Sequence, residues 1–355
     1  MPVIRSLGYT IEIGNTIFRS ISIFLKKKKF TSHVIICDEN TIQYCLPLLL
    51  SKCPQLNTAH IIEIESGESS KSLEFCSHIW QTLLENGADK NSLVINLGGG
   101  VVSDLGGFCA STYKRGISFI NIPTTLLSMA DASVGGKTGI DFSGIKNSIG
   151  TFSQPVAVFI YPAFLDTLPE RHIKNGFAEI LKMALIMDLK FCKELRNSSI
   201  EKNKIKMLQK SVSLKNKIVL KDPLDNGIRK ILNFGHTIGH AIESCLLGTE
   251  DELLHGEAVA IGMIIESLIA YDKKLLKLNE LQLAVDLIKT NYSVLEFSDA
   301  EVDKIIELML QDKKNKNNKI RMSLINKIGS CKYDIEVSIT QIQKAFKTYH
   351  QIIGA

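Results

Sequence analysis

The sequence lacks the patterns that mark several protein classes. None of its eight cysteines forms a C-x-x-C pair, and the N-terminal residues show no signal-peptide pattern, so we expect reduced thiols in a cytoplasmic protein. No uncharged apolar run approaches the roughly 18 residues that a membrane-spanning helix requires. There is no internal repeat that would indicate a solenoid or propeller. These absences favour an ordinary soluble protein.

The sequence also has little excess of charge of either sign. Lysine and arginine number 42 against 37 acidic residues, a net charge of +5. This surplus suits an anionic small molecule but is too small for a nucleic-acid-binding surface. With 355 residues, of which 45% are hydrophobic and 22% charged, the chain has the composition of a globular enzyme with two domains.

The first half of the chain alternates short apolar runs with helical patterns. Because the runs are continuously apolar, they predict parallel strands that helices cover on both faces. The expected strands are 33–38, 61–64, 92–97, 117–122 and 156–161. A helical pattern at 70–85 fits a crossover connection between two of them. We therefore predict an α/β N-terminal domain, residues 1–169, with a mostly parallel, Rossmann-like sheet.

The second half is dominated by helical periodicity. Helices are expected at 176–189, 200–220, 235–247, 255–271 and 280–289, with one late pair of strands at 321–325 and 331–337. This pattern predicts a mainly α-helical domain over residues 170–355. In such a two-domain enzyme we expect the active site in the cleft between the domains.

A glycine-rich turn follows the third expected strand. Gly98, Gly99 and Gly100 let backbone N–H groups approach a pyrophosphate at the start of a helix. Ser103 stands where the dinucleotide fingerprint has its last glycine, so a merely tight strand-to-helix turn is an equal alternative. Thr124 and Thr125 end the next strand, where they could contact a ligand or only cap a helix.

A polar, glycine-containing segment comes next along the chain. Lys137 follows Gly135 and Gly136, and Lys146 precedes Asn147. Lysines in such a setting can reach an anion without steric obstruction. An exposed surface loop explains the same composition.

The helical half carries a set of residues with metal-ligand character. Glu179 and Lys182 are three residues apart, and His236 and His240 are four apart, so each pair shares one helix face. With His255, one carboxylate and two imidazoles could bind a metal and leave a position for a substrate oxygen. The H-x-x-x-H spacing lacks the glutamate of the metalloprotease motif, and any one histidine alone would be read as structural.

Three further polar residues precede or accompany this set. Lys215, Arg229 and Asn233 could hold a carboxylate and a hydroxyl, or could form surface ion pairs.

Together these segments resemble the successive motifs of the 3-dehydroquinate synthase family. The matching stretches are LGGGVVSDLGGF, YKRG, IPTTLLSMADASVGGKTGID, IKNSIGTF, GFAEILKMALI, IRKILNFGHTIGHAIE, LHGEAVAIGM and QDKKN. They occur in order through about residues 66 to 314. The connection at 246–252 and Ser103 depart from the usual family pattern.

The resemblance implies roles for individual residues. NAD would be held by Asp38, Glu68, Lys71, Gly99, Gly100, Asp104, Thr124, Thr125, Lys137, Lys146, Phe164 and Thr167. A divalent metal, Zn²⁺ or alternatively Co²⁺, would be bound by Glu179, His236 and His255. The catalytic set would be Lys137, Lys182, Lys215, Arg229, Asn233 and His240, and the substrate would also contact Asp131, Lys146, Asn147 and Lys314 or its neighbour Lys313. Arg115 would reach the phosphate pocket of a neighbouring subunit, which implies a homodimer.

The resemblance also implies a reaction. Members of this family close 3-deoxy-D-arabino-heptulosonate 7-phosphate into 3-dehydroquinate with release of phosphate, in the shikimate pathway of aromatic amino-acid biosynthesis. Two enzyme classes remain alternatives at this point, an iron-type polyol or alcohol dehydrogenase and another sugar-phosphate cyclase. A catalytically silent NAD-binding protein is a third, but such a protein would not need every ligand position filled.

Overall fold

The protein consists of two structural units that are not the two halves of the chain. The computed structural model describes residues 3–143, 145–196, 200–311 and 320–354. One unit contains residues 1–173 and 204–224, and the other contains 174–203 and 225–355. The sequence placed 204–224 in the second domain; the contacts of this segment put it in the first, because an amphipathic pattern predicts a helix but not which core the helix joins.

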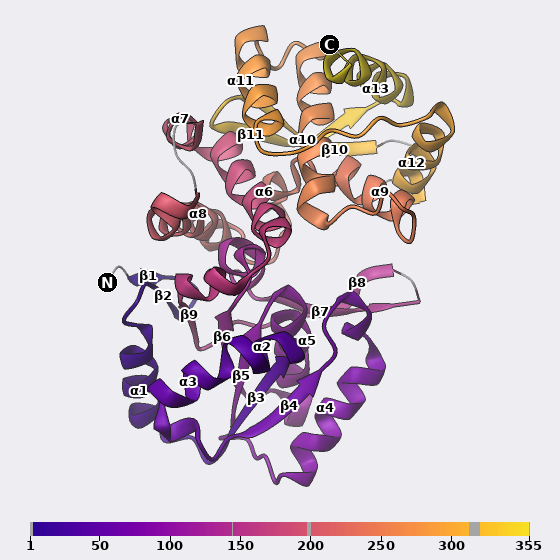
Figure 1. Ribbon diagram of the computed structural model, residues 1–355. Helices are drawn as coiled ribbons and strands as arrows, with labels where there is room; N and C mark the ends of the chain where they lie inside the picture. The colour runs from indigo at the N-terminus through magenta and orange to yellow at the C-terminus, as the bar shows by residue number, and fades with distance from the viewer. Residues whose placement is uncertain (1–2, 144, 197–199, 312–319, 355) are drawn as a thin grey trace. The chain divides into compact units, whose positions relative to one another are not determined.

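The first unit is built on a seven-stranded sheet. Its order is β1-β2-β9-β6-β5-β3-β4, in which β1 and β2 pair antiparallel and all other neighbours are parallel. The strands are β1 (Val3–Arg5), β2 (Thr10–Ile13), β3 (His33–Asp38), β4 (His60–Ile64), β5 (Leu93–Gly98), β6 (Ser118–Pro123) and β9 (Ala157–Ile160). Figure 1 shows them in the indigo-to-magenta part of the chain. The mostly parallel sheet predicted from the apolar runs is confirmed.

Helices cover this sheet because its strands are apolar on both faces. Val34, Ile36 and Val94 pack with α4 and α5 in one cluster, while the alternate residues Ile35 and Ile95 are buried on the opposite face. The helical elements of this unit are α1 (Ile17–Lys28), α2 (Glu39–Tyr44), α3 (Leu46–Lys52), η1 (Pro54–Leu56), η2 (Glu68–Ser70), α4 (Leu73–Glu85), α5 (Gly100–Thr112), η3 (Tyr113–Arg115), η4 (Ser128–Ala132), η5 (Pro162–Thr167) and α8 (Ile200–Lys221).

A two-stranded hairpin stands apart from the main sheet. Strands β7 (Lys137–Phe142) and β8 (Ile145–Phe152) pair antiparallel with each other. The composition of this segment predicted a loop, which is wrong. Nearly all of β8 is exposed, so the segment lacks the buried apolar run by which strands are found. Gly139 and Gly150 face each other across the hairpin, and a Cβ on Gly139 would lie 2.6 Å from the Ile149 carbonyl oxygen.

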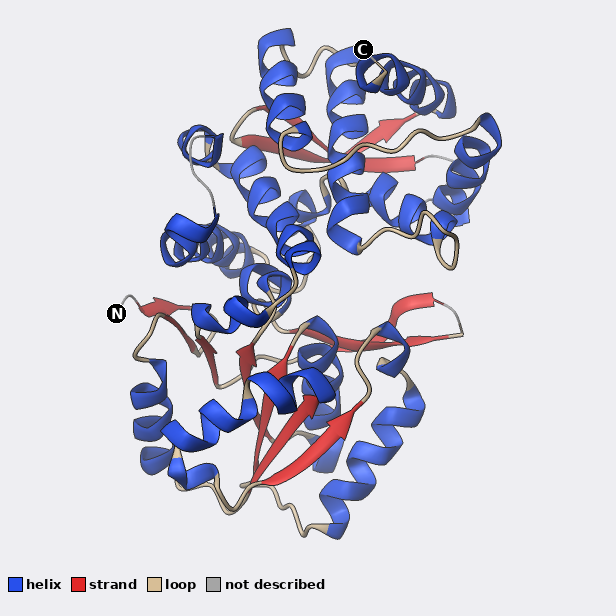
Figure 2. Cartoon of the chain, in the orientation of Figure 1, coloured by secondary structure: helices blue, strands red, loops and turns tan. Residues whose placement is uncertain are grey.

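The second unit is mainly helical, as the periodicity predicted. Its helical elements are α6 (Glu170–Met187), α7 (Leu189–Arg196), η6 (Ile228–Asn233), α9 (His236–Leu246), α10 (His255–Asp272), α11 (Leu278–Lys289), α12 (Asp299–Gln311) and α13 (Ile339–Ile353). The late strand pair is also present, as β10 (Ile320–Lys327) and β11 (Ser330–Val337). Figure 2 shows helices making up most of this unit.

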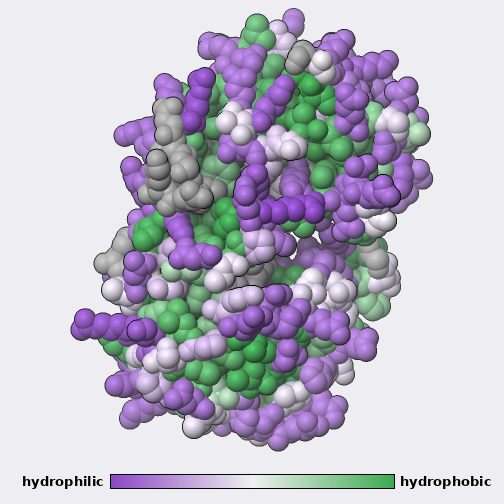
Figure 3. Space-filling model, viewed as in Figure 1, coloured by the Kyte–Doolittle hydropathy of each residue, from purple (hydrophilic) through white to green (hydrophobic). Residues whose placement is uncertain are grey.

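The core of the second unit is centred on α10. Every residue from Ala258 to Ala270 is buried, as expected for a helix that other elements surround on all sides. Polar residues cover much of each unit on the face shown in Figure 3. Among the described residues, no helix combines the length and apolar character needed to cross a membrane.

Candidate active site

The glycine-rich turn lies between β5 and α5 in the first unit. Gly99 is the N-cap of α5 and provides no side chain to cap it, so the first N–H groups of the helix are available to an anion. A Cβ on Gly99 would lie 3.1 Å from Thr125 Cγ2, which shows how closely the end of β6 approaches the turn. Thr124 N donates to Gly98 O at 3.0 Å. This cradle fits a pyrophosphate.

Ser103, which departs from the family pattern, fits inside this turn. Its hydroxyl donates to Gly99 O at 3.1 Å and to Gly100 O at 3.0 Å. The side chain is buried, and its polar atom is satisfied by the first turn of the helix. The substitution therefore leaves the cradle open.

A buried lysine organises the charged residues beside the cradle. Lys71 is 4% exposed, and its Nζ lies 2.8 Å from Asp104 Oδ2, 3.6 Å from Glu68 Oε1 and 2.5 Å from Asn147 Oδ1. Burial lowers the pKa of Lys71, but the carboxylates of Asp104 and Glu68 outweigh it and raise that pKa above its ordinary value. Burial is also the main cause of the raised pKa of Asp104. Lys71 thus links predicted NAD ligands to Asn147 on the hairpin.

The other predicted residues of the first unit fall into smaller groups. Lys215, on α8, lies 2.7 Å from Asp131 Oδ1 and donates to Asp131 O at 2.6 Å. Asp38 caps α2 by accepting from Thr41 N at 2.8 Å.

The remaining three predicted contacts in this unit lie away from those groups. Phe164 is buried against Phe18 and Tyr161. The Thr167 hydroxyl donates to the Phe164 carbonyl oxygen at 3.4 Å. Arg115 is exposed on η3 with φ +64°. Lys313 and Lys314 lie outside the described residues.

Three helices of the second unit bring the predicted metal ligands together. Glu179 comes from α6, His236 from α9 and His255 from the first position of α10. Glu179 Oε1 lies 3.4 Å from His236 Nε2 and 3.9 Å from His255 Nε2. Ligands placed tetrahedrally about 2.0–2.1 Å from a zinc ion are separated by roughly 3.4 Å. The spacing of these atoms fits a metal between them.

The hydrogen bonds of the two imidazoles leave the same nitrogen available on each. His236 Nδ1 lies 3.1 Å from Phe234 O, and His255 Nδ1 lies 3.3 Å from Glu243 Oε2. In each ring Nδ1–H donates, so Nε2 presents its lone pair toward Glu179. Burial first, and then the charge of Lys182, holds the pKa of His236 well below its ordinary value, which keeps this ring neutral.

Glu179 itself is almost completely enclosed. It is 1% exposed and forms an ion pair with Lys182, which is equally buried. Its Oε2 faces the Lys182 ammonium, and among the described residues its Oε1 accepts no hydrogen bond. Three electron-rich atoms thus converge without a donor between them, an arrangement that a cation would stabilise.

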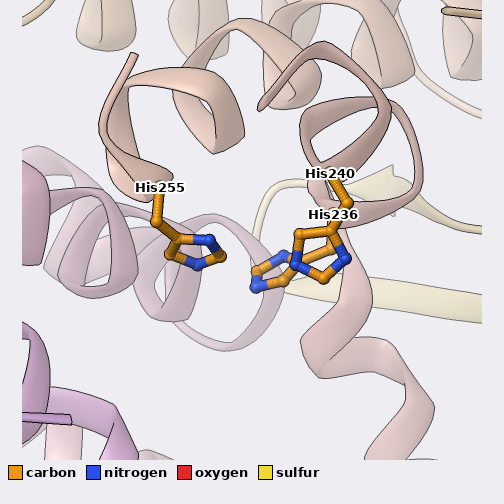
Figure 4. Close-up of side chains that lie close together, drawn as sticks. All are labelled: His236, His240 and His255. Atoms are coloured by element: carbon orange, nitrogen blue, oxygen red, sulfur yellow. The ribbon is translucent and has the colours of Figure 1, made fainter. Parts of the chain in front are cut away.

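His240 lies beside this set and makes a second grouping possible. Its ring is 5.2 Å from that of His236 and 5.5 Å from that of His255, and the three imidazoles could also hold a metal. Figure 4 shows the three rings, with His240 and His236 on one helix and His255 on another. His240 is exposed, whereas Glu179 supplies the negative charge that a dication needs, so we favour the set with Glu179.

Close helix packing allows ligands on α9 and α10 to meet. A Cβ on Gly262 of α10 would overlap the Gly235 carbonyl oxygen, and one on Gly239 would lie 2.9 Å from Val259 Cα. At the other side, Gly256 N donates to Asn175 Oδ1 of α6 at 2.5 Å. These contacts keep His255 in place even though the 246–252 connection departs from the family pattern.

The last two predicted residues of this unit lie on η6. Arg229 is 3% exposed and Asn233 is half-buried. They lie on the short helix directly before His236.

Glu243 was missed by the sequence reasoning. A signal for it exists, because Glu243 follows His240 by three residues and His236 by seven, which places all three on one face of α9.

Comparison with known proteins identifies relatives along most of the chain. The family model described as 3-dehydroquinate synthase N-terminal matches residues 61–175, and the 3-dehydroquinate synthase C-terminal model matches 176–315. A 3-dehydroquinate synthase of Parabacteroides distasonis is 39% identical over 335 residues, which is 93% of this chain and 95% of the relative.

Solved structures share the fold over nearly the whole length. A 2-epi-5-epi-valiolone synthase from Streptomyces hygroscopicus, with NAD⁺ and Zn²⁺ bound, superimposes with a TM-score of 0.86 at 26% identity and covers 99% of both chains. A 2-deoxy-scyllo-inosose synthase complexed with carbaglucose-6-phosphate, NAD⁺ and Co²⁺ has a TM-score of 0.86 at 22% identity, covering 98% of this chain and 99% of its own.

Proposed function

We propose, from the premise that this chain belongs to the 3-dehydroquinate synthase family, that its two units divide the parts of one reaction between them. The chain is a lyase that converts 3-deoxy-D-arabino-heptulosonate 7-phosphate to 3-dehydroquinate and phosphate. The single observation that carries the proposed site is the convergence of Glu179 Oε1 with the Nε2 atoms of His236 and His255.

The second unit provides the metal ligands and the side chains that act on the substrate next to the metal. Glu179, His236 and His255 hold Zn²⁺, or Co²⁺ in its place, through one charged and two neutral ligands. When bound, the metal supplies Lewis-acid stabilisation to the substrate oxygen that loses its proton as hydride leaves. Lys182 balances the charge of Glu179. His240, exposed on the helix face of His236, moves a proton at a ring nitrogen.

The first unit holds the dinucleotide. The N–H groups at the start of α5 bind the pyrophosphate, and Lys71, Asp104 and the two threonines at the end of β6 orient the rest of the cofactor. Asp38 and Glu68 provide oxygens for ribose hydroxyls, and Lys137, Lys146, Phe164 and Thr167 complete the contacts. When bound, NAD supplies a reversible hydride acceptor, so the overall reaction consumes none of it.

Cationic side chains bind the two anionic groups of the substrate. Arg229, supported by Asn233, suits the carboxylate because a guanidinium pairs with it through two hydrogen bonds. The phosphate is held by Lys137, Lys146 and Asn147, whose exposed positions on the β7–β8 hairpin leave them accessible to solvent. Lys215 and Asp131 hold a substrate hydroxyl, and Lys313 or Lys314 adds a further cation.

We also propose that the chain acts as a homodimer. Arg115 is exposed on η3, beside Lys114, and both have positive φ. A guanidinium held outward by such a turn is available to a phosphate bound by a second copy of the chain.

One assay tests the proposed function. The purified chain is incubated with 3-deoxy-D-arabino-heptulosonate 7-phosphate, catalytic NAD and zinc, while phosphate, 3-dehydroquinate and NADH are followed together. We expect phosphate and dehydroquinate in equal amounts and no net NADH. Stoichiometric NADH without phosphate would instead indicate an iron-type dehydrogenase, and phosphate with a different carbocycle would indicate another sugar-phosphate cyclase.

A further inference from the structure

The helix that carries His236 begins without a capping side chain of its own. The N-cap of α9 is Gly235, with φ +81°, and His236 is the first helical residue. The first N–H groups of a helix have no partner within the helix and need acceptors from elsewhere. Because this end of the helix is buried, an unsatisfied N–H group there would lower the stability of the fold by about 1–3 kcal/mol.

The missing acceptor comes from a carboxylate on the neighbouring helix. Glu266, on α10, is 0% exposed. Its Oε2 accepts from Gly235 N at 2.6 Å, and its Oε1 accepts from Ile238 N at 3.2 Å. Burial raises the pKa of Glu266 to about 8, and the backbone N–H groups of Gly235, Ile238 and Thr237 oppose that rise because they stabilise the carboxylate. Both oxygens thus hold backbone on the two sides of His236, at the helix end where a negative charge is favoured.

The surroundings of Glu266 leave little other reason for a carboxylate. In the run from Ala258 to Ala270 it is the only charged residue, and the whole run is buried. Burial of a carboxylate is costly unless hydrogen bonds compensate it. A hydrophobic residue would fill this core position without that cost, so the carboxylate must serve the backbone that it contacts.

We propose that Glu266 is a positioning residue for the metal ligand His236, which it fixes by holding the backbone N–H groups of Gly235, Thr237 and Ile238. This inference rests on the metal site proposed above. The orientation of the ring depends on that backbone, because His236 Nδ1 is held by Phe234 O directly before the turn. A shift at the start of α9 therefore moves Nε2 relative to Glu179.

The test compares Glu266→Gln with the matched control Ser267→Ala. Glutamine keeps the volume but has one acceptor oxygen, so its NH₂ group faces a backbone donor. Ser267 is equally buried on the same helix, and among the described residues its hydroxyl donates to Met263 O of its own helix, at 2.6 Å. For the full-length chain and both variants, the zinc dissociation constant is measured by chelator competition. Thermal unfolding of the metal-free forms and the visible absorption of bound Co²⁺ are recorded beside it.

We expect Glu266→Gln to weaken zinc binding by about tenfold or more, the effect typical of residues that orient a ligand, and to change the Co²⁺ spectrum. Ser267→Ala should change neither. If Glu266→Gln lowers only the unfolding temperature and leaves zinc affinity and spectrum unchanged, Glu266 is a structural cap and the proposal is overturned.

Three further outcomes are also decisive. Glu266→Asp keeps the charge but is one methylene too short to reach both sides of the turn, so it should lose zinc affinity as well. If Glu266→Gln and Glu266→Asp both fail to fold with or without zinc, Glu266 stabilises the core rather than positioning the ligand, and the proposal fails. Absence of zinc binding by the parent chain would refute the metal site itself, not this inference alone.

Discussion

The two units prepare for their ligands in opposite ways. In the first unit the candidate ligand-binding charges are already paired with one another, Lys71 with Asp104 and Lys215 with Asp131. In the second unit Glu179 is paired with Lys182 through Oε2, but its Oε1 faces two imidazole nitrogens with no donor between them among the described residues. The nucleotide must therefore exchange partners with existing pairs, whereas a cation completes an arrangement that is otherwise repulsive. We expect variants to be more damaging on the metal side.

Replacing Glu179 by Gln should have the largest effect. It removes the only charged ligand of the proposed set, so we expect the zinc content after dialysis to be lost and kcat/KM to fall roughly 10³-fold. The change also leaves Lys182 buried without its partner, which costs about 3–5 kcal/mol of stability. Metal analysis, steady-state kinetics and thermal unfolding measure the three effects.

A double variant separates the two consequences. Adding Lys182→Met to Glu179→Gln should restore much of the unfolding temperature but none of the zinc. The affinity for NAD should stay within about twofold in both variants, because the residues proposed to bind NAD lie in the first unit. Zinc retained at full affinity in Glu179→Gln would show that His236, His240 and His255 form the metal site instead.

Replacing Lys71 by Met tests the nucleotide side and should have a smaller effect. Losing a hydrogen bond from a charged group costs about 1.5–3 kcal/mol, so the Kd for NAD should rise roughly 10- to 100-fold. The same change releases Asn147, so the KM for the phosphorylated substrate should also rise. Isothermal titration with NAD and steady-state kinetics provide the measurements. A fall in zinc affinity would contradict the assignment of NAD binding and metal binding to different units.

Replacing Glu243 by Gln should weaken the metal site without removing it. The carboxylate lies 3.3 Å from His255 Nδ1 and holds the ring so that Nε2 faces the metal. Loss of such a partner typically weakens metal binding about 10- to 100-fold. Chelator competition measures the zinc dissociation constant. Glu301→Gln is the control, because the hydrogen bonds of the Glu301 carboxylate among the described residues come from Ser298 at the start of α12. Equal zinc affinity in both variants would show that Glu243 does not orient the ligand.

The fold was predictable where residues are buried on both sides. Strands such as β3 and β5 were found because nearly every residue between their polar boundaries is apolar, with Asn96 the exception in β5. Helix α9 has an amphipathic pattern, whereas α10 is apolar almost all round and is recognised as a helix by its length. The β7–β8 hairpin was missed because β8 is almost entirely exposed and the buried part of β7, Thr138 to Ile140, is too short an apolar run to mark a strand. The place of α8 in the first unit was missed because its amphipathic face does not show which core it covers.

The candidate site was predictable from spacing only in part. The four-residue spacing of His236 and His240 indicates a shared face, and the family motifs add Glu179 and His255. The supporting residues Asn175 and Glu266 act on backbone groups far away in the chain, so no local pattern marks them. Only the isolation of Glu266 within an apolar run indicates that a core position was given to a charge for a reason.

The smallest effect is expected from Lys230, the neighbour of Arg229 on η6. Lys230 Nζ lies 2.8 Å from Asp334 Oδ2, with about a third of each side chain exposed, and pairs of this kind contribute about 0–1 kcal/mol. Lys230→Met should therefore leave kcat/KM within about twofold, whereas Arg229→Gln should raise the KM for the carboxylate-bearing substrate at least tenfold. Steady-state kinetics of both variants measures the difference. Equal kinetic losses would mean that η6 acts as a structural element and that Arg229 does not bind the substrate carboxylate.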